Sequence, residues 1–265
     1  VPKYEWRFRD LDRADQIYAS VLSHADDRVG RLLDTLDRLK IAGNTLVIFS
    51  SDNGPARAAK PTQLSLQYDT ATGAGWGIGA SKGITGGRRG YKSSLFEGGI
   101  GVPFIARWPG RIAAGHVDDA SLISAVDLLP TFCELAGCEL PKNYVADGVS
   151  VVNVLQGEPL RKREKPLFWK FGSPWPPPAS RPDHWVSWAV VHGQWKLVAN
   201  RDLTHVELFD IITDVNESND LKETKPGVVG DLLAILKNWQ ASLPEKPTGK
   251  VFSKLRRETK KSSTK

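Results

Sequence analysis

Hydrophobic residues in the first 40 positions recur at helical spacing, and a short uninterrupted hydrophobic run follows them. Between residues 11 and 40 they stand every three or four positions, at Ile17, Val21, Leu22, Ala25, Val29, Leu32, Leu33, Leu36 and Leu39. This pattern predicts one long amphipathic helix, which Gly43 and Asn44 would end. Residues 45–50 (TLVIFS) are β-branched and aromatic, which predicts a strand buried on both faces. A helix, a tight turn and a buried strand form the unit of an α/β sheet.

The next hundred residues contain fewer regular elements. Residues 52–101 are rich in glycine, and we expect few strands there. A second hydrophobic run at 102–108 (VPFIARW) predicts another buried strand. Residues 124–137 predict a helix, with Asp127 near its start, Pro130 in its first turn and Gly137 as its terminator.

The pattern changes after residue 157. Residues 158–165 are charged and lack hydrophobic periodicity, which is typical of a linker. Beyond them, short aromatic runs predict strands at 167–171, 188–191, 195–198 and 207–211. Gly193 and Gln194 separate the middle two runs, as in a two-residue hairpin. Residues 226–243 predict an amphipathic helix packed on this small antiparallel sheet, which makes an α+β unit.

The formal charge of +6 does not indicate a nucleic-acid partner. Residues 246–265 carry eight Lys or Arg and a single Glu, so residues 1–245 are close to neutral. Such a basic, Ser- and Thr-containing end predicts a disordered tail. No hydrophobic run approaches the roughly 18 residues that a membrane span requires. The two cysteines, Cys133 and Cys138, suggest two small buried or half-buried residues at a helix end and no zinc site.

Two stretches carry residues suited to chemistry. Asp52 and Asn53 follow the first predicted strand, at the carboxyl end where open α/β sheets bind ligands. Their side chains offer hard oxygen atoms for Ca²⁺ or Mg²⁺, although the pentapeptide alone is also a simple turn. Lys92 stands in a glycine-rich segment that ends in Glu97-Gly98-Gly99 and could approach a small anion. By itself this segment is better explained as a long glycine loop.

The order of these stretches resembles the sulfatase family. In that family a long helix and a strand lead into S-D-N-G, then K-x-x-x-x-E-G-G, V-P-x-I-x-x-W-P-G, D-L-x-P-T and a late W-K-L hairpin. The sequence matches these motifs in the same order, at Asp52-Asn53-Gly54, Lys92 with Glu97-Gly98-Gly99, Val102–Gly110, Asp127–Thr131 and Trp195-Lys196-Leu197. The resemblance runs from about residue 18 to residue 239.

The resemblance implies a fold and a set of roles. The implied fold is α/β: residues 1–156 would be part of an alkaline-phosphatase-like sulfatase domain with a mixed sheet flanked by helices, residues 166–243 a small C-terminal α+β domain, and residues 246–265 the tail. Asp52 and Asn53 would ligate a divalent cation, Ca²⁺ or alternatively Mg²⁺. Lys92 would contact the sulfate, and Glu97, Gly98 and Gly99 would shape its loop. Trp175, His184 and Trp185, in or beside a Pro-rich segment, are candidates for stacking on a sugar ring.

The family's nucleophile is not found in these 265 residues. It is a formylglycine made from the Cys or Ser of a C/S-x-P-S-R motif, and no such motif occurs here. The sequence also contains no methionine and begins at Val1. We therefore expect a C-terminal fragment that is inactive alone. The resemblance implies a periplasmic or secreted location, while no signal peptide lies in this chain.

The expected activity is hydrolysis of the sulfate esters of carbohydrates or of aryl sulfates. Two alternatives stay open at this point. One is a phosphomonoester or phosphonate hydrolase of the same superfamily, which an upstream Thr or Ser nucleophile would indicate. The other is a non-catalytic remnant that binds an anion or a carbohydrate. We expect no nucleic-acid partner, and the sequence indicates no particular oligomeric state.

Overall fold

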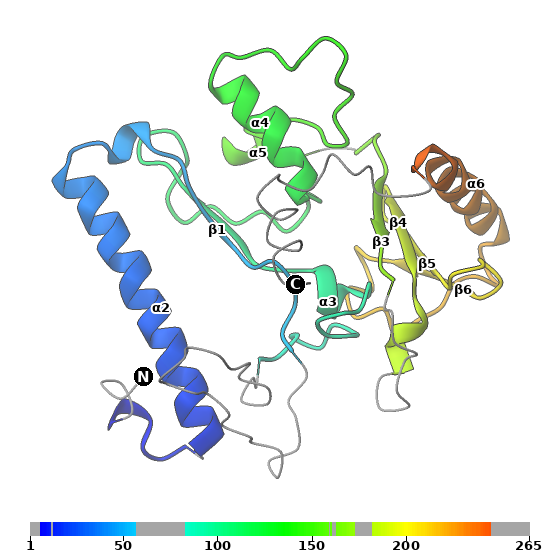
Figure 1. Cartoon of the computed structure of the whole chain (residues 1–265), viewed down its shortest axis with the longest axis horizontal. Helices are drawn as coiled ribbons and strands as arrows, with labels where there is room; N and C mark the ends of the chain where they lie inside the picture. The colour runs from blue at the N-terminus through cyan, green and yellow to red at the C-terminus, as the bar shows by residue number, and fades with distance from the viewer. Residues whose placement is uncertain are drawn as a thin grey trace, which may run out of the picture.

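The computed structural model describes residues 6–11, 13–56, 83–158, 160, 163–172 and 182–244 of the 265-residue chain. The predicted basic tail and Trp175 lie outside the described residues. Figure 1 shows the long helix α2 on one side, α4 and α5 at the top, and a small sheet covered by α6 on the other side. Between them runs a connecting segment that contains α3.

The first part of the chain forms the predicted helix and strands. A short 3-10 helix η1 (Trp6–Phe8) precedes α2 (Arg13–Arg38), and η2 (Ala42–Asn44) leads into β1 (Val47–Ser50). β2 (Phe104–Arg107) pairs with β1 in antiparallel fashion, with Phe49 opposite Ile105. The predicted positions of α2, β1 and β2 are thus confirmed.

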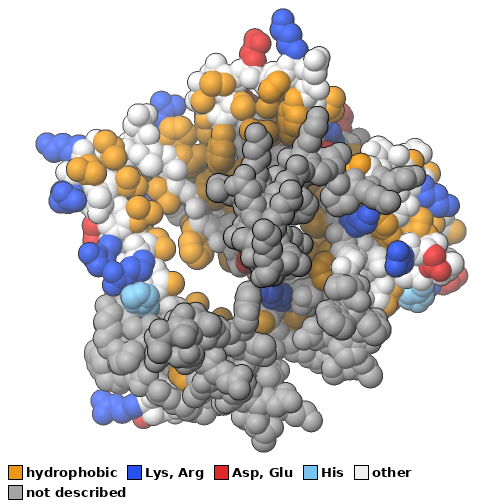
Figure 2. Space-filling view, in the orientation of Figure 1, with side chains coloured by type: hydrophobic (Ala, Val, Ile, Leu, Met, Phe, Trp, Pro, Cys, Tyr) orange, Lys and Arg blue, Asp and Glu red, His pale blue; other side chains and the backbone are white. Residues whose placement is uncertain are grey.

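The prediction that these strands are buried on both faces was wrong. Phe49 is 48% exposed and Ile105 is 59% exposed, and on α2 Val21 and Leu22 are also exposed. Figure 2 shows hydrophobic side chains at the surface in the half of the view that holds α2 and β1. Within the described residues the sheet of β1 and β2 has only these two strands. Its hydrophobic side chains therefore remain partly uncovered.

The predicted helix at 124–137 forms as η4 (Ala125–Asp127) followed by α4 (Leu128–Leu135), and α5 (Val152–Leu155) packs nearby. Ser124 and Asp127 form a reciprocal capping box at the start. Gly137 follows the helix with a φ of +65°, a conformation that favours glycine. Cys133 is half-buried, but Cys138 is exposed, contrary to the expectation for the second cysteine.

The predicted linker at 158–165 is anchored at one residue. Arg163 is 5% exposed, and its guanidinium makes a bidentate ion pair with the fully buried Asp127 at 2.7 and 2.9 Å. Asp127 also accepts the backbone N–H groups of Ser124 and Val149. An ion pair between residues far apart in the chain thus buries one residue of the charged segment, which local periodicity does not reveal.

The small sheet has the order β3-β4-β5-β6 and is entirely antiparallel. Its strands are β3 (Leu167–Lys170), β4 (Trp188–His192), β5 (Trp195–Ala199) and β6 (Val206–Asp210), with the 3-10 helix η5 (Pro182–Trp185) before β4. The β4–β5 hairpin turns at Gly193 and Gln194 as predicted, and Gly193 has a φ of +61°.

Two hydrophobic cores lie on the two faces of this sheet. On one face α6 (Pro226–Ser242) contributes Leu232 and Leu236, as the helical periodicity predicted. On the other face Leu95 and Phe96 pack against Val198 and Phe209. The segment before α3 (Glu97–Ile100) is therefore packed against the small sheet. This contact joins the two predicted domains, residues 1–156 and 166–243. The division into these domains stays a prediction. Within the described residues, no helix is both long enough and hydrophobic enough to cross a bilayer.

Candidate functional site

The predicted metal ligands lie directly after β1. The Asp52 side chain is exposed and Asn53 is half-buried. Ser51 Oγ donates a hydrogen bond to the carbonyl oxygen of Asn53 at 2.9 Å, and Asn53 Nδ2 donates to the carbonyl oxygen of Gly54 at 2.9 Å. Asn53 Nδ2 is hydrogen-bonded to its own chain, and Asn53 Oδ1 is the side-chain atom that could ligate a cation.

Lys92 stands in a tight turn next to this pair. The Ser94 N–H donates to the Tyr91 carbonyl at 3.0 Å, and Ser93, the residue after Lys92, has a φ of +73°. A serine rarely adopts this conformation, so the surrounding contacts hold the turn in shape. The Lys92 backbone N–H donates to the carbonyl of Pro55 at 2.9 Å, while its side chain is exposed.

The glycines of the two motifs touch each other. The Gly54 N–H donates to the carbonyl oxygen of Gly99 at 2.8 Å. A Cβ added at Gly54 would lie 1.9 Å from the carbonyl oxygen of Gly98, which leaves no room for a side chain. The structure therefore brings together the two motifs that the sequence singled out, Asp52-Asn53-Gly54 and Lys92 with Glu97-Gly98-Gly99.

The donor set near β1 is suited to a hard cation but is incomplete. Asp52 and Asn53 supply carboxylate and amide oxygens, the ligand types that Ca²⁺ and Mg²⁺ prefer. Ca²⁺ takes about six to eight oxygen ligands, so two residues cannot hold it alone. Across the described ranges, no group of three or more His, Cys, Asp or Glu could hold a metal ion. These two residues fit a divalent cation as one part of a larger site.

Three charged residues around this loop were missed at the level of sequence. Lys196 on β5 is fully buried, and its Nζ lies 2.7 Å from Glu97 Oε1 and 2.8 Å from Glu217 Oε1. A lysine inside an alternating hydrophobic strand run is the signal that could have found it. Burial raises the pKa of Glu217 above its usual value, although the charge of Lys196 opposes this effect.

The third residue, Arg89, ties the loop to the small sheet. Its Nε lies 2.8 Å from Asp183 Oδ1 and its Nη1 lies 2.6 Å from Glu207 Oε2. The guanidinium also stands 3.8 Å from the ring centroid of Phe96. Burial lowers the pKa of Arg89, but the hydrogen bonds to Glu207 and Asp183 outweigh burial and raise it.

Of the three residues predicted to stack on a substrate ring, the structure describes His184 and Trp185. Trp185 is half-buried and packs edge-on against Phe96 at 6.2 Å and against His205 at 4.3 Å between ring centroids. His184 is also half-buried. Trp185 thus has a packing role next to the residue that precedes Glu97, and Trp175 is outside the described residues.

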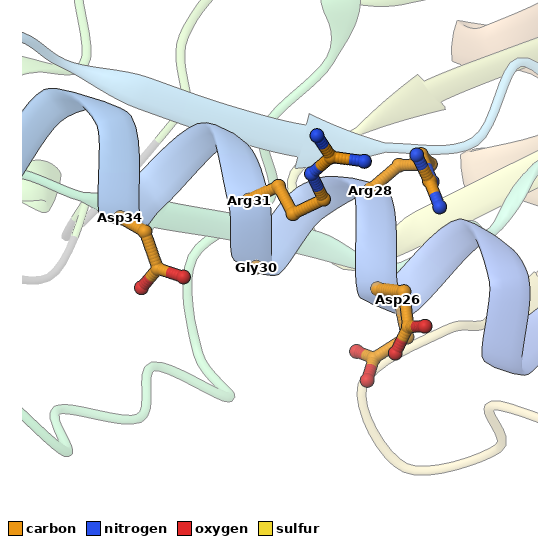
Figure 3. Close-up of a pocket in the computed structure, with 6 residues that line it drawn as sticks. Asp26, Arg28, Gly30, Arg31 and Asp34 are labelled. Carbon is orange, nitrogen blue, oxygen red and sulfur yellow. The ribbon is translucent and has the colours of Figure 1, made fainter.

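A surface hollow on α2 is separate from these residues. It is lined by Asp26, Asp27, Arg28, Gly30, Arg31 and Asp34, all from the same helix. In Figure 3 the carboxylates of Asp26 and Asp34 point to one side of the helix and the side chains of Arg28 and Arg31 point to the other. None of the lining residues belongs to the two motifs at 52–54 and 92–99.

Two family models match the chain. One, described as Sulfatase, matches residues 3–138. The other, described as N-sulphoglucosamine sulphohydrolase, C-terminal, matches residues 88–262. The two matches overlap over the segment that carries Lys92 and Glu97 and together cover most of the chain.

Curated relatives are sulfatases that are longer than this chain. The N-acetylgalactosamine-6-sulfatase of Sus scrofa is 39% identical over 159 residues, 59% of this chain and 26% of that protein. The N-acetylgalactosamine-6-O-sulfatase of Bacteroides thetaiotaomicron is 26% identical over 82% of this chain and 40% of its own length. The steryl-sulfatase of Rattus norvegicus is 31% identical over 87% of this chain and 41% of its own length. The chain thus spans between about a quarter and two fifths of these relatives.

Solved structures show the same fold. A sulfatase from a Bacteroides thetaiotaomicron locus for glycosaminoglycan metabolism matches with a TM-score of 0.58 and 25% identity, over 82% of this chain and 43% of that one. The structure of Ps i-CgsB in complex with a neocarrahexaose matches with a TM-score of 0.65 and 23% identity, over 95% of this chain and 50% of that one. The predicted fold class, an α/β sulfatase domain with a small antiparallel sheet, is confirmed by these neighbours.

Proposed function

The chain belongs to the sulfatase family, and on that basis we propose that it supplies part of the metal and sulfate site of a sulfuric ester hydrolase. The observation that carries this proposal is the contact between the two motifs: Gly54 bonds to Gly99, and Lys92 bonds to Pro55 through their backbones. These bonds join the segment that carries the exposed Lys92 side chain to the segment that carries Asp52 and Asn53.

The proposed chemistry is charge stabilisation. A sulfuryl group spreads negative charge over its oxygens, and this charge shifts toward the leaving oxygen as the S–O bond breaks. Lys92 would bind a sulfate oxygen and stabilise that charge with its fixed ammonium. Asp52 and Asn53 would hold a divalent cation, Ca²⁺ or alternatively Mg²⁺, which when bound supplies Lewis-acid polarisation of the sulfate. The formylglycine nucleophile would come from residues outside this sequence.

The substrates that we propose are sulfated carbohydrates or aryl sulfates. The relatives include sulfatases named for N-acetylgalactosamine 6-sulfate and for steryl sulfate, and one solved neighbour was determined with D-glucosamine-2-N,6-O-disulfate as its substrate. As candidates for stacking on the sugar or aryl ring we propose His184 and Trp185, which are half-buried, and Trp175, which lies outside the described residues. By family resemblance we also propose a periplasmic or secreted location.

Replacement of Lys92 tests this function. In the full-length protein, Lys92→Ala should reduce turnover of a chromogenic aryl sulfate by about 10²–10³-fold, as loss of one transition-state contact does. The matched control is Lys142→Ala, another exposed lysine, which should leave the rate unchanged. An aryl phosphate assayed in parallel distinguishes the phosphohydrolase alternative. An unchanged rate in Lys92→Ala removes Lys92 from the site.

A further inference from the structure

The face of the small sheet that points away from α6 carries a buried lysine. Along β5, Trp195, Leu197 and Ala199 pack into the core shared with α6, so Lys196 and Val198 point to the opposite face. There Val198 packs against Leu95 and Phe96. The Lys196 side chain is 0% exposed. A charged group buried to this extent requires opposite charges and hydrogen bonds around it.

Both carboxylates that neutralise Lys196 come from outside the sheet. Glu97 belongs to α3 and Glu217 to the turn after β6, and their Oε1 atoms lie 2.7 and 2.8 Å from Lys196 Nζ. Glu217 Oε2 also accepts the backbone N–H of Glu97 at 2.6 Å. Its carboxylate therefore binds Lys196 with one oxygen and the start of α3 with the other. No side chain of the preceding residue, Phe96, caps this helix.

This contact leads directly to the metal ligands. Glu97 is followed by Gly98 and Gly99, and the carbonyl of Gly99 accepts the N–H of Gly54, the residue after Asn53. The Gly98 N–H donates to the carbonyl of Arg89 at 2.6 Å. The glycine backbones meet here without side chains between them, so a tightly packed backbone path leads from Glu97 to Gly54, the residue after Asn53.

Packing alone does not require a charged residue at position 196. A hydrophobic residue at position 196 would fill the same face beside Val198, and replacing a buried ion pair with hydrophobic residues is often neutral or stabilising. An ion triad instead fixes direction, because each carboxylate oxygen binds only a donor in the right place. Glu217 itself has a φ of +53°, a strained backbone that places its carboxylate between Lys196 and Glu97.

We propose that Lys196 and Glu217 are positioning residues for Asp52 and Asn53, the two proposed cation ligands. They hold Glu97, and through the backbone of Gly98, Gly99 and Gly54 they set the position of Asp52 and Asn53. The small C-terminal sheet thereby controls how well the chain binds its cation. This inference rests on the proposed function, since it takes Asp52 and Asn53 as cation ligands.

The test measures cation affinity separately from stability. In the full-length protein, Lys196→Met keeps the length of the side chain and removes its charge. We expect the Ca²⁺ dissociation constant from isothermal titration calorimetry to rise roughly tenfold, as it does when an outer-shell partner of a metal ligand is lost. Turnover of an aryl sulfate should fall at low Ca²⁺ and recover at saturating Ca²⁺. A purely structural role would lower the melting temperature but leave the Ca²⁺ affinity of the folded protein unchanged.

Two further variants complete the experiment. Lys222→Met removes a lysine of the same domain that pairs with Asp220 at the surface, and it should leave Ca²⁺ affinity unchanged. Glu217→Gln keeps Lys196 paired with Glu97 but removes the negative charge that Glu217 presents to Lys196, so it should weaken Ca²⁺ binding in the same direction. It decides the question if Lys196→Met does not fold.

The outcomes separate this inference from the proposed function. If the wild-type protein binds Ca²⁺ and the folded Lys196→Met or Glu217→Gln variant binds it with the same affinity, the inference is overturned and the proposed function is not. A wild-type protein that neither binds Ca²⁺ nor cleaves the sulfate overturns the proposed function and this inference together.

Discussion

At the scale of single residues, we expect buried ion pairs to affect the stability of the protein more than exposed ones. Asp127 and Arg163 are 0% and 3% exposed at the side chain and form a bidentate pair, whereas Arg107 and Asp37 meet at the surface at 3.4 Å. A surface pair contributes about 0–1 kcal/mol to stability. Removal of one partner of a buried pair leaves an uncompensated charge and costs about 3–5 kcal/mol.

Arg163→Met should therefore destabilise the protein strongly. It leaves the Asp127 carboxylate buried with only the N–H groups of Ser124 and Val149 as donors. We expect the free energy of unfolding, measured by urea denaturation, to fall by about 3–5 kcal/mol. The matched control Arg107→Met should change it by about 1 kcal/mol or less. A similar small effect for both would show that the buried pair does not anchor the segment.

Glu217 makes stability depend on pH. Because burial raises its pKa above 4.5 in the folded protein, the native state binds a proton that the unfolded state has released. The contribution of Glu217 is fully present below about pH 4.5 and is lost as the pH rises through the raised pKa. In Glu217→Gln the unfolding free energy should lack this decline, whereas Glu223→Gln, at an exposed position, should retain it. Parallel pH profiles for wild type and Glu217→Gln would contradict the prediction.

At the scale of elements, the short helix α3 contains glycines in close contact with the surrounding backbone. α3 has only four residues, and two of them are buried glycines in contact with backbone on several sides. The much longer α6 contains Gly227 and Gly230, which have open space around them. Glycine thus allows other backbone segments to approach α3 closely, whereas the glycines of α6 have no packing role.

Gly98→Ala and Gly230→Ala should have opposite effects. An alanine Cβ at Gly98 would lie 2.3 Å from the carbonyl oxygen of Gly90 and 2.5 Å from that of Arg89, so the loop that carries Lys92 must move. We expect loss of both stability and turnover in the full-length protein. At Gly230 the Cβ meets nothing within 4 Å, so alanine should stabilise α6 by about 0.5–1 kcal/mol. Thermal unfolding of both variants checks the prediction; a neutral Gly98→Ala would contradict the close contact.

At the scale of the whole molecule, the two halves of the described structure contribute differently to the site. The α2–β1–β2 part carries Asp52 and Asn53, while the small sheet holds the loop of Lys92 through Arg89, Lys196 and Glu217. Phe96 and Glu97 join the two parts, since Phe96 packs against the small sheet and the Glu97 N–H donates to Glu217.

The 265-residue chain by itself should show no sulfatase turnover. Its sequence has no C/S-x-P-S-R motif, and Asp52 and Asn53 are too few to complete the cation's coordination. Incubation of the purified chain with Ca²⁺ and a chromogenic aryl sulfate should release no product above the uncatalysed rate. Metal-dependent hydrolysis by the isolated chain would refute this expectation.

The sequence by itself determined the elements and the motifs. Helical spacing located α2 and α6, and alternation with a Gly-Gln turn located the β4–β5 hairpin, because these depend on contacts between near neighbours in the chain. The order of Asp52-Asn53-Gly54 and Lys92 to Gly99 indicated the family. The roles of these residues remain predictions.

Only the tertiary structure decided which hydrophobic residues are covered and which charged residues are paired. Periodicity predicted that β1 and β2 are buried, but exposure depends on which strands lie beside them, and Phe49 and Ile105 are uncovered. The linker residue Arg163 and the strand residue Lys196 gain their partners from positions 36 and 99 residues away. The free energy of a buried charge depends on the ions that surround it in space, and no local pattern in the chain records them.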